Sequence, residues 1–235
     1  CCYLFRINKF GFTPELKENQ MDVKTIVLSI TKEQLASLPT VTYPGHIVVV
    51  NTVEQAKSAL ETIRRYSVVG FDTETKPSFR KGHTNQVALI QISTGDCCYL
   101  FRINKFGFTP ELKEFIEDES ITKVGLSLKD DFHVLHKLHN FLPSSFVDLQ
   151  EMVKDFCIRD CSLQKIYGII FNERISKSQR LSNWEASLLT PPQQTYASID
   201  AWACIKIYNY LISGKFNPEE SRYIYTPLSE ENNSE

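Results

Sequence analysis

The sequence lacks the features that mark several common protein classes. It has no apolar run near the roughly 18 to 20 residues that a membrane-spanning helix needs, and its N-terminus lacks the residue order of a signal peptide. It also has no excess of basic residues, with 26 Lys and Arg against 28 Asp and Glu. A protein that binds nucleic acid through charge alone is usually basic, so such binding here would need local patches and bound cations.

The cysteine pattern excludes a further class. The chain has seven cysteines, but Cys97 and Cys98 are adjacent, Cys157 and Cys161 lie four residues apart, and no second CxxC-like pair completes a zinc site. Without a secretory signal, reduced thiols are the simpler interpretation. Together these absences predict a soluble, cytoplasmic protein with no membrane partner.

Residues 1–18 repeat residues 97–114 letter for letter. Natural internal repeats drift and usually recur more than twice, so we interpret residues 1–20 as a duplicated segment of artefactual origin, with Met21 as the natural start. The alternative is that the copy pairs with a sheet edge, in this chain or a neighbouring one. The remainder divides into an N-terminal arm (21–50), one domain (51–213) and a polar, acidic tail (214–235) that we expect to be loosely ordered.

The pattern of apolar residues predicts an α/β fold. Strand-like runs cover 46–50, 67–73, 86–93, 97–103, 122–126 and 146–149, and helical patterns cover about 52–66, 110–118, 130–139 and most of 150–212. The three strands between 67 and 103 follow one another closely, which predicts an antiparallel meander, and strands and helices alternate afterwards. A meander followed by alternation indicates a mixed β-sheet flanked by helices.

The strongest functional signal is a pair of acids, Asp72 and Glu74, at the end of an apolar strand run. At i and i+2 on a strand the two side chains face the same way. Adjacent carboxylates repel, so one holds a proton or both share a cation, and magnesium prefers such oxygen ligands. The pair alone is weak evidence, because acids also occur at exposed strand ends.

A second signal lies at the start of the last long helical pattern. Thr190 can cap this helix with Gln193 completing a capping box, and Tyr196 and Asp200 follow at i and i+4. Beside them, four residues at helical spacing predict its buried stripe: Ala197, Ala201, Ile205 and Tyr208. The small residues in that stripe would let the helix approach the sheet closely. A Tyr–Asp pair on the surface is the competing interpretation.

A third signal is the pair Asp130 and Asp131, which opens a helix after the strand at 122–126. An acid at this point can cap the helix N-terminus, where the helix dipole favours negative charge. Capping explains one of the two aspartates but not obviously both.

Taken in order, FDTET, GLSLKDDFHVL and YASIDA resemble the three exonuclease motifs of the DEDD superfamily, and the tyrosine four residues before the last aspartate resembles its DEDDy branch. QVALIQIS and SQRLSNWEASLLTPPQQTYASIDA are most similar to exonuclease domains of the Werner syndrome protein type. The resemblance covers roughly residues 50 to 212, and three motifs in order are more specific than any one. It implies a ribonuclease H-like fold and a metal-dependent 3′–5′ exonuclease that releases nucleoside 5′-monophosphates.

The resemblance also implies roles for the site residues. The family's metal ligands correspond to four positions: Asp72, Glu74, Asp131 and Asp200. Its water-orienting tyrosine corresponds to Tyr196. We prefer Asp131 to Asp130 because it lies four residues before Leu135, as the family's apolar spacing requires, but Asp130 stays an alternative. Two divalent cations, Mg²⁺ or Mn²⁺, are expected to bind there.

The candidate substrate-binding residues are Thr73, Thr75, Phe79, Phe132 and Lys177. Thr75 would bond a terminal 3′-hydroxyl, and Phe79 or Phe132 would stack on a base, although packing is the alternative for each. Two basic groups could follow the backbone phosphates: Arg80 with Lys81, and Arg174 with Lys177 and Arg180. The competing interpretation is a solvated charged loop. We interpret Trp184 as a structural plug beneath the last helix.

The expected partner is single-stranded or recessed-end nucleic acid, with DNA favoured over RNA. One alternative is ribonuclease D-like RNA 3′-end processing, whose proteins usually carry an added helical domain. Another is a catalytically silent nucleic-acid-binding module, which would be expected to lack a carboxylate. Zinc binding by His133, His136 and His139 is disfavoured, because residues six apart lie about 120° apart around a helix.

Overall fold

The computed structural model describes residues 26–78 and 85–225. A six-stranded sheet forms its centre, in the order β1-β4-β3-β2-β5-β6. The strands are β1 (His46–Val50), β2 (Val68–Thr75), β3 (Val87–Ser93), β4 (Cys97–Phe101), β5 (Thr122–Gly125) and β6 (Phe146–Asp148). β2, β3 and β4 pair antiparallel, whereas β1, β5 and β6 join in parallel. The predicted meander and mixed sheet are therefore confirmed.

Two strand ends differ from the expectation by two residues, and the others agree to within one residue. β2 continues to Thr75, two residues farther, because β3 pairs with it along this length. Asp72 and Glu74 therefore both lie within a paired strand, whereas the expected strand ended between them. β4 stops at Phe101, two residues early, where the chain turns into the short helix α3 (Ile103–Phe106).

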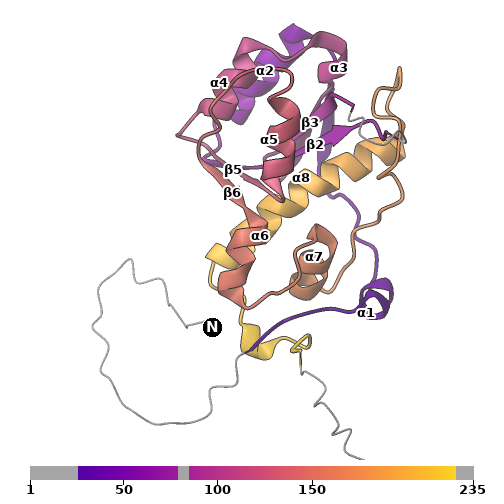
Figure 1. The fold of residues 1–235 in the computed structure, drawn as a ribbon, viewed down its shortest axis with the longest axis vertical. Coiled ribbons are helices and arrows are strands. Elements are labelled where there is room, and N and C mark those ends of the chain that lie inside the picture. The colour runs from indigo at the N-terminus through magenta and orange to yellow at the C-terminus, as the bar shows by residue number, and fades with distance from the viewer. Residues whose placement is uncertain (1–25, 79–84, 226–235) are drawn as a thin grey trace, which may run out of the picture.

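Helices cover both faces of the sheet. Besides α3, they are α1 (Lys32–Ala36), α2 (Val53–Ile63), α4 (Pro110–Glu117), α5 (Leu128–Leu135), α6 (Leu149–Met152), α7 (Leu163–Phe171) and α8 (Pro191–Ile212), with the 3-10 turns η1 (Val153–Phe156) and η2 (Pro218–Glu220). α2, α4 and α5 pack on one face, and α7 and α8 on the other. In Figure 1, α8 crosses the middle of the molecule, with α2 and α4 above it and α7 and α1 below it. None of the helices in these ranges combines the length and apolar character needed to cross a bilayer.

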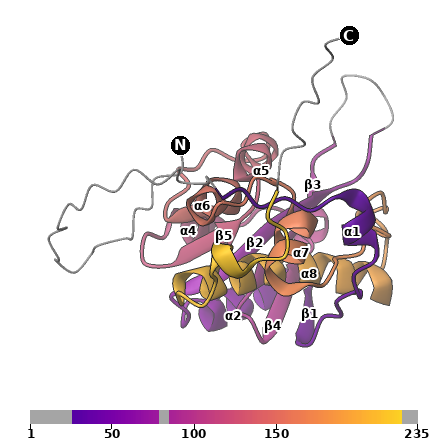
Figure 2. The same ribbon diagram turned by 90° about the horizontal axis from the view of Figure 1, so that it is seen from below.

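The long helix α8 begins as its sequence predicts. The Thr190 side chain accepts a hydrogen bond from the Gln193 amide, and the Gln193 side chain accepts one from the Thr190 amide, which confirms the capping box. Three members of the expected stripe are buried and Tyr208 is half-buried. α7 lies alongside α8, as Figure 2 shows from below.

A glycine decides how closely α8 crosses the sheet. A Cβ atom added to Gly70 of β2 would lie 1.9 Å from the carbonyl oxygen of Ala201 in α8. Any larger residue at this point would push the helix away from β2. The close approach expected from the small residues of α8 therefore also depends on a residue of the strand.

Residues 172–190, which we expected to be mostly helical, form an irregular connection between α7 and α8. Asn172 ends α7 in the left-handed conformation, with φ of 58°. Trp184 is fully buried, and the buried Arg102 guanidinium donates to the carbonyls of Ala186 and Ser187. These distant contacts anchor the segment without helical hydrogen bonds, and a local pattern does not reveal them.

The N-terminal arm and the C-terminal segment pack against each other. Leu28 is fully buried, and its backbone forms isolated β-bridges with Ile158 and Ile224. Tyr223 is buried, and its hydroxyl donates to the Asn172 side chain at 3.0 Å. In the described part of the expected tail, Tyr223 therefore packs against the core, whereas most of residues 214–225, Glu219 and Glu220 included, are exposed. The duplicated segment and residues 226–235 lie outside the described residues.

Candidate active site

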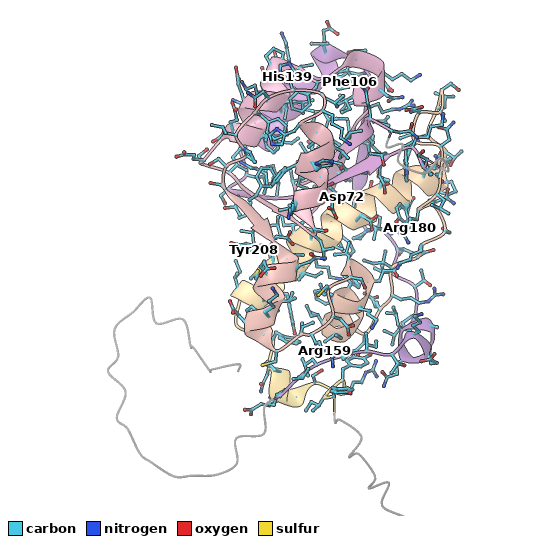
Figure 3. The ribbon with its side chains drawn as sticks, in the orientation of Figure 1. Asp72, Phe106, His139, Arg159, Arg180 and Tyr208 are labelled. Carbon is cyan, nitrogen blue, oxygen red and sulfur yellow. The ribbon has the colours of Figure 1, made fainter. Side chains whose placement is uncertain are left out.

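Three carboxylates meet on the α8 face of the sheet. Asp72 and Glu74 extend from β2 and Asp200 from the middle of α8, and one oxygen of each lies within 4.8 Å of the others. Figure 3 labels Asp72, which lies beside α8 near the centre of the molecule. Within 26–78 and 85–225, no other three His, Cys, Asp or Glu side chains gather this closely. The strand pair and the helix aspartate, predicted separately, form one cluster.

This cluster is electrostatically unfavourable without a counter-charge. Burial raises the pKa of Asp200 to about 7, and burial with repulsion from neighbouring acids raises the pKa of Glu74 to about 9. The same two causes raise the pKa of Asp72 well above its ordinary value. At neutral pH such acids either hold protons or bind cations. Oxygen donors of this kind suit Mg²⁺ or Mn²⁺, so the residues fit the expected metals.

Asp131 faces the cluster and Asp130 does not. The Asp131 carboxylate accepts a hydrogen bond from the hydroxyl of Thr73, which lies between the two acids of β2. Burial raises the pKa of Asp131 to about 7. Asp130 is exposed, and its carboxylate accepts from the Ser127 hydroxyl at 3.0 Å. The geometry therefore favours Asp131 as the residue of the second motif that acts at the site.

The turn before α5 brings Asp131 to β2. Ser127 adopts the left-handed conformation with φ of 61°, and α5 starts at Leu128, two residues before the expected start. The Asp148 carboxylate at the end of β6 accepts hydrogen bonds from the amides of Ser127 (3.1 Å) and Leu128 (2.9 Å). Sequence reasoning missed Asp148, because its partners lie 21 and 20 residues earlier in the chain.

Tyr196 lies one turn before Asp200 on α8, and the two side chains are hydrogen-bonded. Burial, with the nearby acids, raises the pKa of Tyr196 well above its ordinary value. Its ring centroid lies 6.0 Å from that of Trp184, which is fully buried against Ala197 and Ala201. Trp184 is thus the structural plug that we expected.

A cleft with a volume of about 520 Å³ opens over the acids. Lys177 and Arg180 of the irregular segment line it. Their positive charges partly oppose the rise in pKa caused by burial, Lys177 at Asp200 and Arg180 at Glu74. Figure 3 labels Arg180 next to the N-terminal half of α8. Arg174 does not join them, because its guanidinium donates to the Leu38 carbonyl at 3.0 Å.

The other candidate substrate contacts divide into three groups. Thr73 lines the cleft. Thr75 and Phe132 are half-buried and do not form part of its wall, and the Phe132 ring packs against that of Phe146 with centroids 4.8 Å apart. Phe79 and the two basic residues after it lie outside the described residues.

Part of the cleft wall carries no signal in the sequence. It comes from the α6–α7 region and from residues behind the acids: Leu126, Gln150, Cys161, Ser162, Leu163, Gln164 and Cys204. These side chains reach the cleft because α6 and α7 pack beside α8, and no motif or spacing marks them.

The three histidines of the 130–139 region do not gather at one point. The His136 ring stacks on Phe141 at 4.2 Å, and the His139 ring lies 5.5 Å from that of Phe108. In the part of the chain that the structure describes, no histidine takes part in a metal-ligand cluster.

Comparisons with known proteins agree on one family. A family model described as 3′-5′ exonuclease matches residues 47–213. The bifunctional 3′-5′ exonuclease/ATP-dependent helicase WRN of Mus musculus is 33% identical over 185 residues, which cover 74% of this chain and 13% of that protein. Ribonuclease D of Escherichia coli is 28% identical over 166 residues, covering 67% of this chain and 42% of that protein.

Solved structures show the same architecture. The Nibbler EXO domain of Aedes aegypti has a TM-score of 0.64 at 24% identity, over 74% of this chain and 93% of that one. Escherichia coli ribonuclease D has a TM-score of 0.64 at 24% identity, over 72% of this chain and 44% of that one. At this identity the likeness establishes the fold alone.

The mixed sheet, its flanking helices and these structural neighbours define an α/β protein with a ribonuclease H-like fold. Because the family model matches most of the chain, the chain belongs to the 3′–5′ exonuclease family, whose members are hydrolases. It spans about an eighth of the mouse relative and less than half of ribonuclease D.

Proposed function

We propose that this protein hydrolyses the 3′-terminal phosphodiester of a nucleic acid in a metal-dependent reaction and releases nucleoside 5′-monophosphates. The observation that carries the proposal is the convergence of Asp72, Glu74 and Asp200 within 4.8 Å, with Asp131 bonded to the intervening Thr73. A cluster of half-buried acids of this kind is destabilising without cations, which argues against a purely structural role.

The four acids divide naturally between two cations. Asp72, Glu74 and Asp200 would hold one, and Asp72 with Asp131 would hold the other. When bound, two divalent cations polarise the phosphate, lower the pKa of water and stabilise the charge that develops on the attacking and leaving oxygens. The carboxylates would hold the cations in fixed positions, because Gly70 allows β2 and α8 to approach closely.

Tyr196 would orient the attacking water by a hydrogen bond. Its pKa is raised above the ordinary value, so the phenol keeps its proton at neutral pH and is unsuited to act as a general base. The hydrogen bond to Asp200 holds the phenol at the edge of the acid cluster. Its role is therefore to position the water and not to remove its proton.

Lys177 and Arg180 would bind the phosphates of the substrate strand. Both line the cleft and are exposed, so they can meet a ligand without a change of fold. Thr73 is the other candidate substrate contact that lines the cleft, whereas the roles of Thr75, Phe79 and Phe132 remain those expected from the resemblance.

We propose DNA with a single-stranded or recessed 3′ end as the preferred substrate. The support is the likeness to a relative that joins a 3′–5′ exonuclease to a helicase, at 33% identity. The likeness to ribonuclease D, at 28% identity, favours RNA 3′-end processing as the second candidate.

The test uses 5′-labelled single-stranded DNA, recessed-end duplex DNA and RNA of matching sequence, with Mg²⁺ or Mn²⁺. The wild type should give a ladder that shortens by one nucleotide at a time from the 3′ end. Asp200→Asn should slow it at least about a thousandfold, because metal clamps supply several kcal/mol to such reactions. Asp155→Asn is the matched control, since Asp155 is an exposed acid outside the cleft.

A ladder on RNA but not on DNA would reverse the substrate assignment. No ladder on any substrate, from folded protein with metal present, would favour a silent nucleic-acid-binding module.

A further inference from the structure

A buried amide lies beside the acid cluster without a hydrogen-bond partner. Gln91 of β3 is 0% exposed, and neither its side-chain oxygen nor its nitrogen has a partner in the ranges that the structure describes. A buried polar group left unpaired is destabilising, and most such groups in native proteins are paired. The position of Gln91 therefore calls for a partner that it meets in another state of the site.

Asp72 is the polar group that Gln91 faces across the sheet. The two residues lie directly opposite each other in the antiparallel β2–β3 pair. Opposite residues point to the same face, with Cβ atoms about 4.5 to 5.5 Å apart. On its other side Gln91 lies opposite Leu100 of β4, which offers no hydrogen-bonding group.

The helix α8 closes this space from above. Its residues Ala197 and Ala201 are fully buried, and the Ala201 carbonyl lies directly over Gly70, the neighbour of Asp72 on the same face of β2. Ser198 of α8 is another buried polar residue at this interface; its hydroxyl lies beside the Cys98 thiol and likewise has no hydrogen-bond partner in the described ranges. Gln91 is thus enclosed next to a carboxylate and shielded from solvent.

We propose that Gln91 is a positioning residue for Asp72, whose side-chain amide donates a hydrogen bond to the Asp72 carboxylate when that carboxylate holds a cation. The inference rests on the proposed function, because it needs Asp72 to be a metal ligand. The hydrogen bond forms by rotation of the Gln91 side chain, and the backbone pairing stays unchanged.

An amide is well suited to this task. It donates to a carboxylate oxygen, yet it is neutral and cannot compete with a cation as Lys or Arg would. The hydrogen bond fixes the orientation of the Asp72 carboxylate, and both of its oxygens keep lone pairs for the cations. Partners that orient metal ligands in this way typically change metal affinity by about 10- to 100-fold when they are replaced.

The first test compares Mn²⁺ binding by calorimetry. Gln91→Met keeps the length of the side chain and removes the donor, so the Mn²⁺ dissociation constant should rise about tenfold. Ser198→Ala is the matched control, because it removes another buried, unpartnered polar group at the interface between α8 and the sheet, and its Mn²⁺ affinity should equal that of the wild type. Thermal unfolding of both variants without metal shows whether packing has changed.

The second test uses the wild-type protein and does not depend on how a variant folds. In protein labelled with ¹⁵N-glutamine, the side-chain amide resonances of Gln91, assigned through their backbone connectivity, should shift on addition of Mg²⁺, and their hydrogen exchange should slow. Unchanged resonances would overturn the inference.

Equal Mn²⁺ affinity of Gln91→Met and wild type would overturn it as well, and so would equal weakening by Ser198→Ala. Absence of Mn²⁺ binding by the wild type is a distinct result, because it would overturn the proposed function and this inference with it.

Discussion

The two faces of the central sheet use the same strands in opposite ways. On the face covered by α2, α4 and α5, β2 and β3 contribute side chains such as Val69, Phe71 and Ile92, all fully buried in an apolar cluster. On the α8 face, the alternating residues include Asp72 and Gln91. One face gains stability from burial of apolar area, and the other holds groups whose burial is unfavourable.

This difference shows how the fold supports a cluster of mutually repelling acids on one face of its sheet. Successive residues of a strand point to opposite faces, so an apolar face and an acid face can be built on one strand without interrupting its hydrogen bonds. Lys123 is the exception on the apolar side, since it is fully buried near Phe115 and Phe146. We therefore expect that neutralising the clustered acids will stabilise the protein. We also expect that disturbing the packing of α8 on β2 will reduce activity strongly.

The largest expected effect is that of pH on the metal-free protein. The pKa values of Asp200 and Asp131 are raised to about 7 and that of Glu74 to about 9, so between about pH 4 and pH 9 the folded chain holds more protons than the unfolded chain. The free energy of unfolding should therefore fall as pH rises through this range. Urea unfolding in the presence of a chelator measures it.

Saturating Mg²⁺ should restore the stability lost at the upper end of this range, because the cations replace the protons. A double variant, Glu74→Gln with Asp200→Asn, should flatten the profile of the metal-free protein. If the free energy of unfolding of the metal-free wild type does not change with pH, the pKa values of these acids are not raised in the folded protein.

Gly70→Ala should have the next largest effect. The added Cβ meets the Ala201 carbonyl at 1.9 Å, so α8 must shift away from β2. We expect a loss of about 3 kcal/mol in stability, at the upper end of the usual range for overpacking, and a fall of about 100-fold in activity as Asp200 moves. Val48→Ala, at a half-exposed position on β1, is the control and should change little. Full activity of the Gly70 variant would mean that α8 can retreat without moving the acids.

Lys123 allows a smaller test on the apolar face. Burial lowers its pKa from 10.5 to about 8, so the unfolded chain binds the proton more tightly between these values. The contribution of Lys123 to the free energy of unfolding should rise with pH from about 8 to about 10.5, by roughly 3 kcal/mol. Lys123→Met should remove this rise in denaturation experiments, whereas Lys129→Met, at an exposed position, should retain it. A rise that persists in Lys123→Met belongs to another group.

The smallest effect separates two basic residues of the irregular segment. Lys177 lines the cleft, so Lys177→Ala should raise KM by about three- to tenfold and reduce the salt dependence by about one phosphate contact. The Arg174 guanidinium donates a hydrogen bond to the Leu38 carbonyl and does not line the cleft. Arg174→Ala should therefore leave KM unchanged and lower the free energy of unfolding by about 1 kcal/mol. Equal effects of both on KM would refute the distinction drawn from their contacts.

Much of the site could be predicted because its signals are local. The i, i+2 spacing of Asp72 and Glu74 and the i, i+4 spacing of Tyr196 and Asp200 determine which side chains share a face, whatever surrounds them. The capping box at Thr190 likewise depends on three consecutive positions after it. The irregular segment 172–190 was not predictable, because its anchor Arg102 lies more than 80 residues away in the chain.

The sequence by itself determined the order of the elements, the meander, the acids and their faces, because backbone periodicity and residue chemistry act over short distances. Only the tertiary structure decided that Asp131 and not Asp130 meets Thr73, that Asp148 holds the turn before α5, and that Gln91 lies enclosed beside Asp72. Each of these depends on strand pairing or helix packing between distant segments. Such contacts are set by the free energy of the whole fold and leave no trace in local spacing.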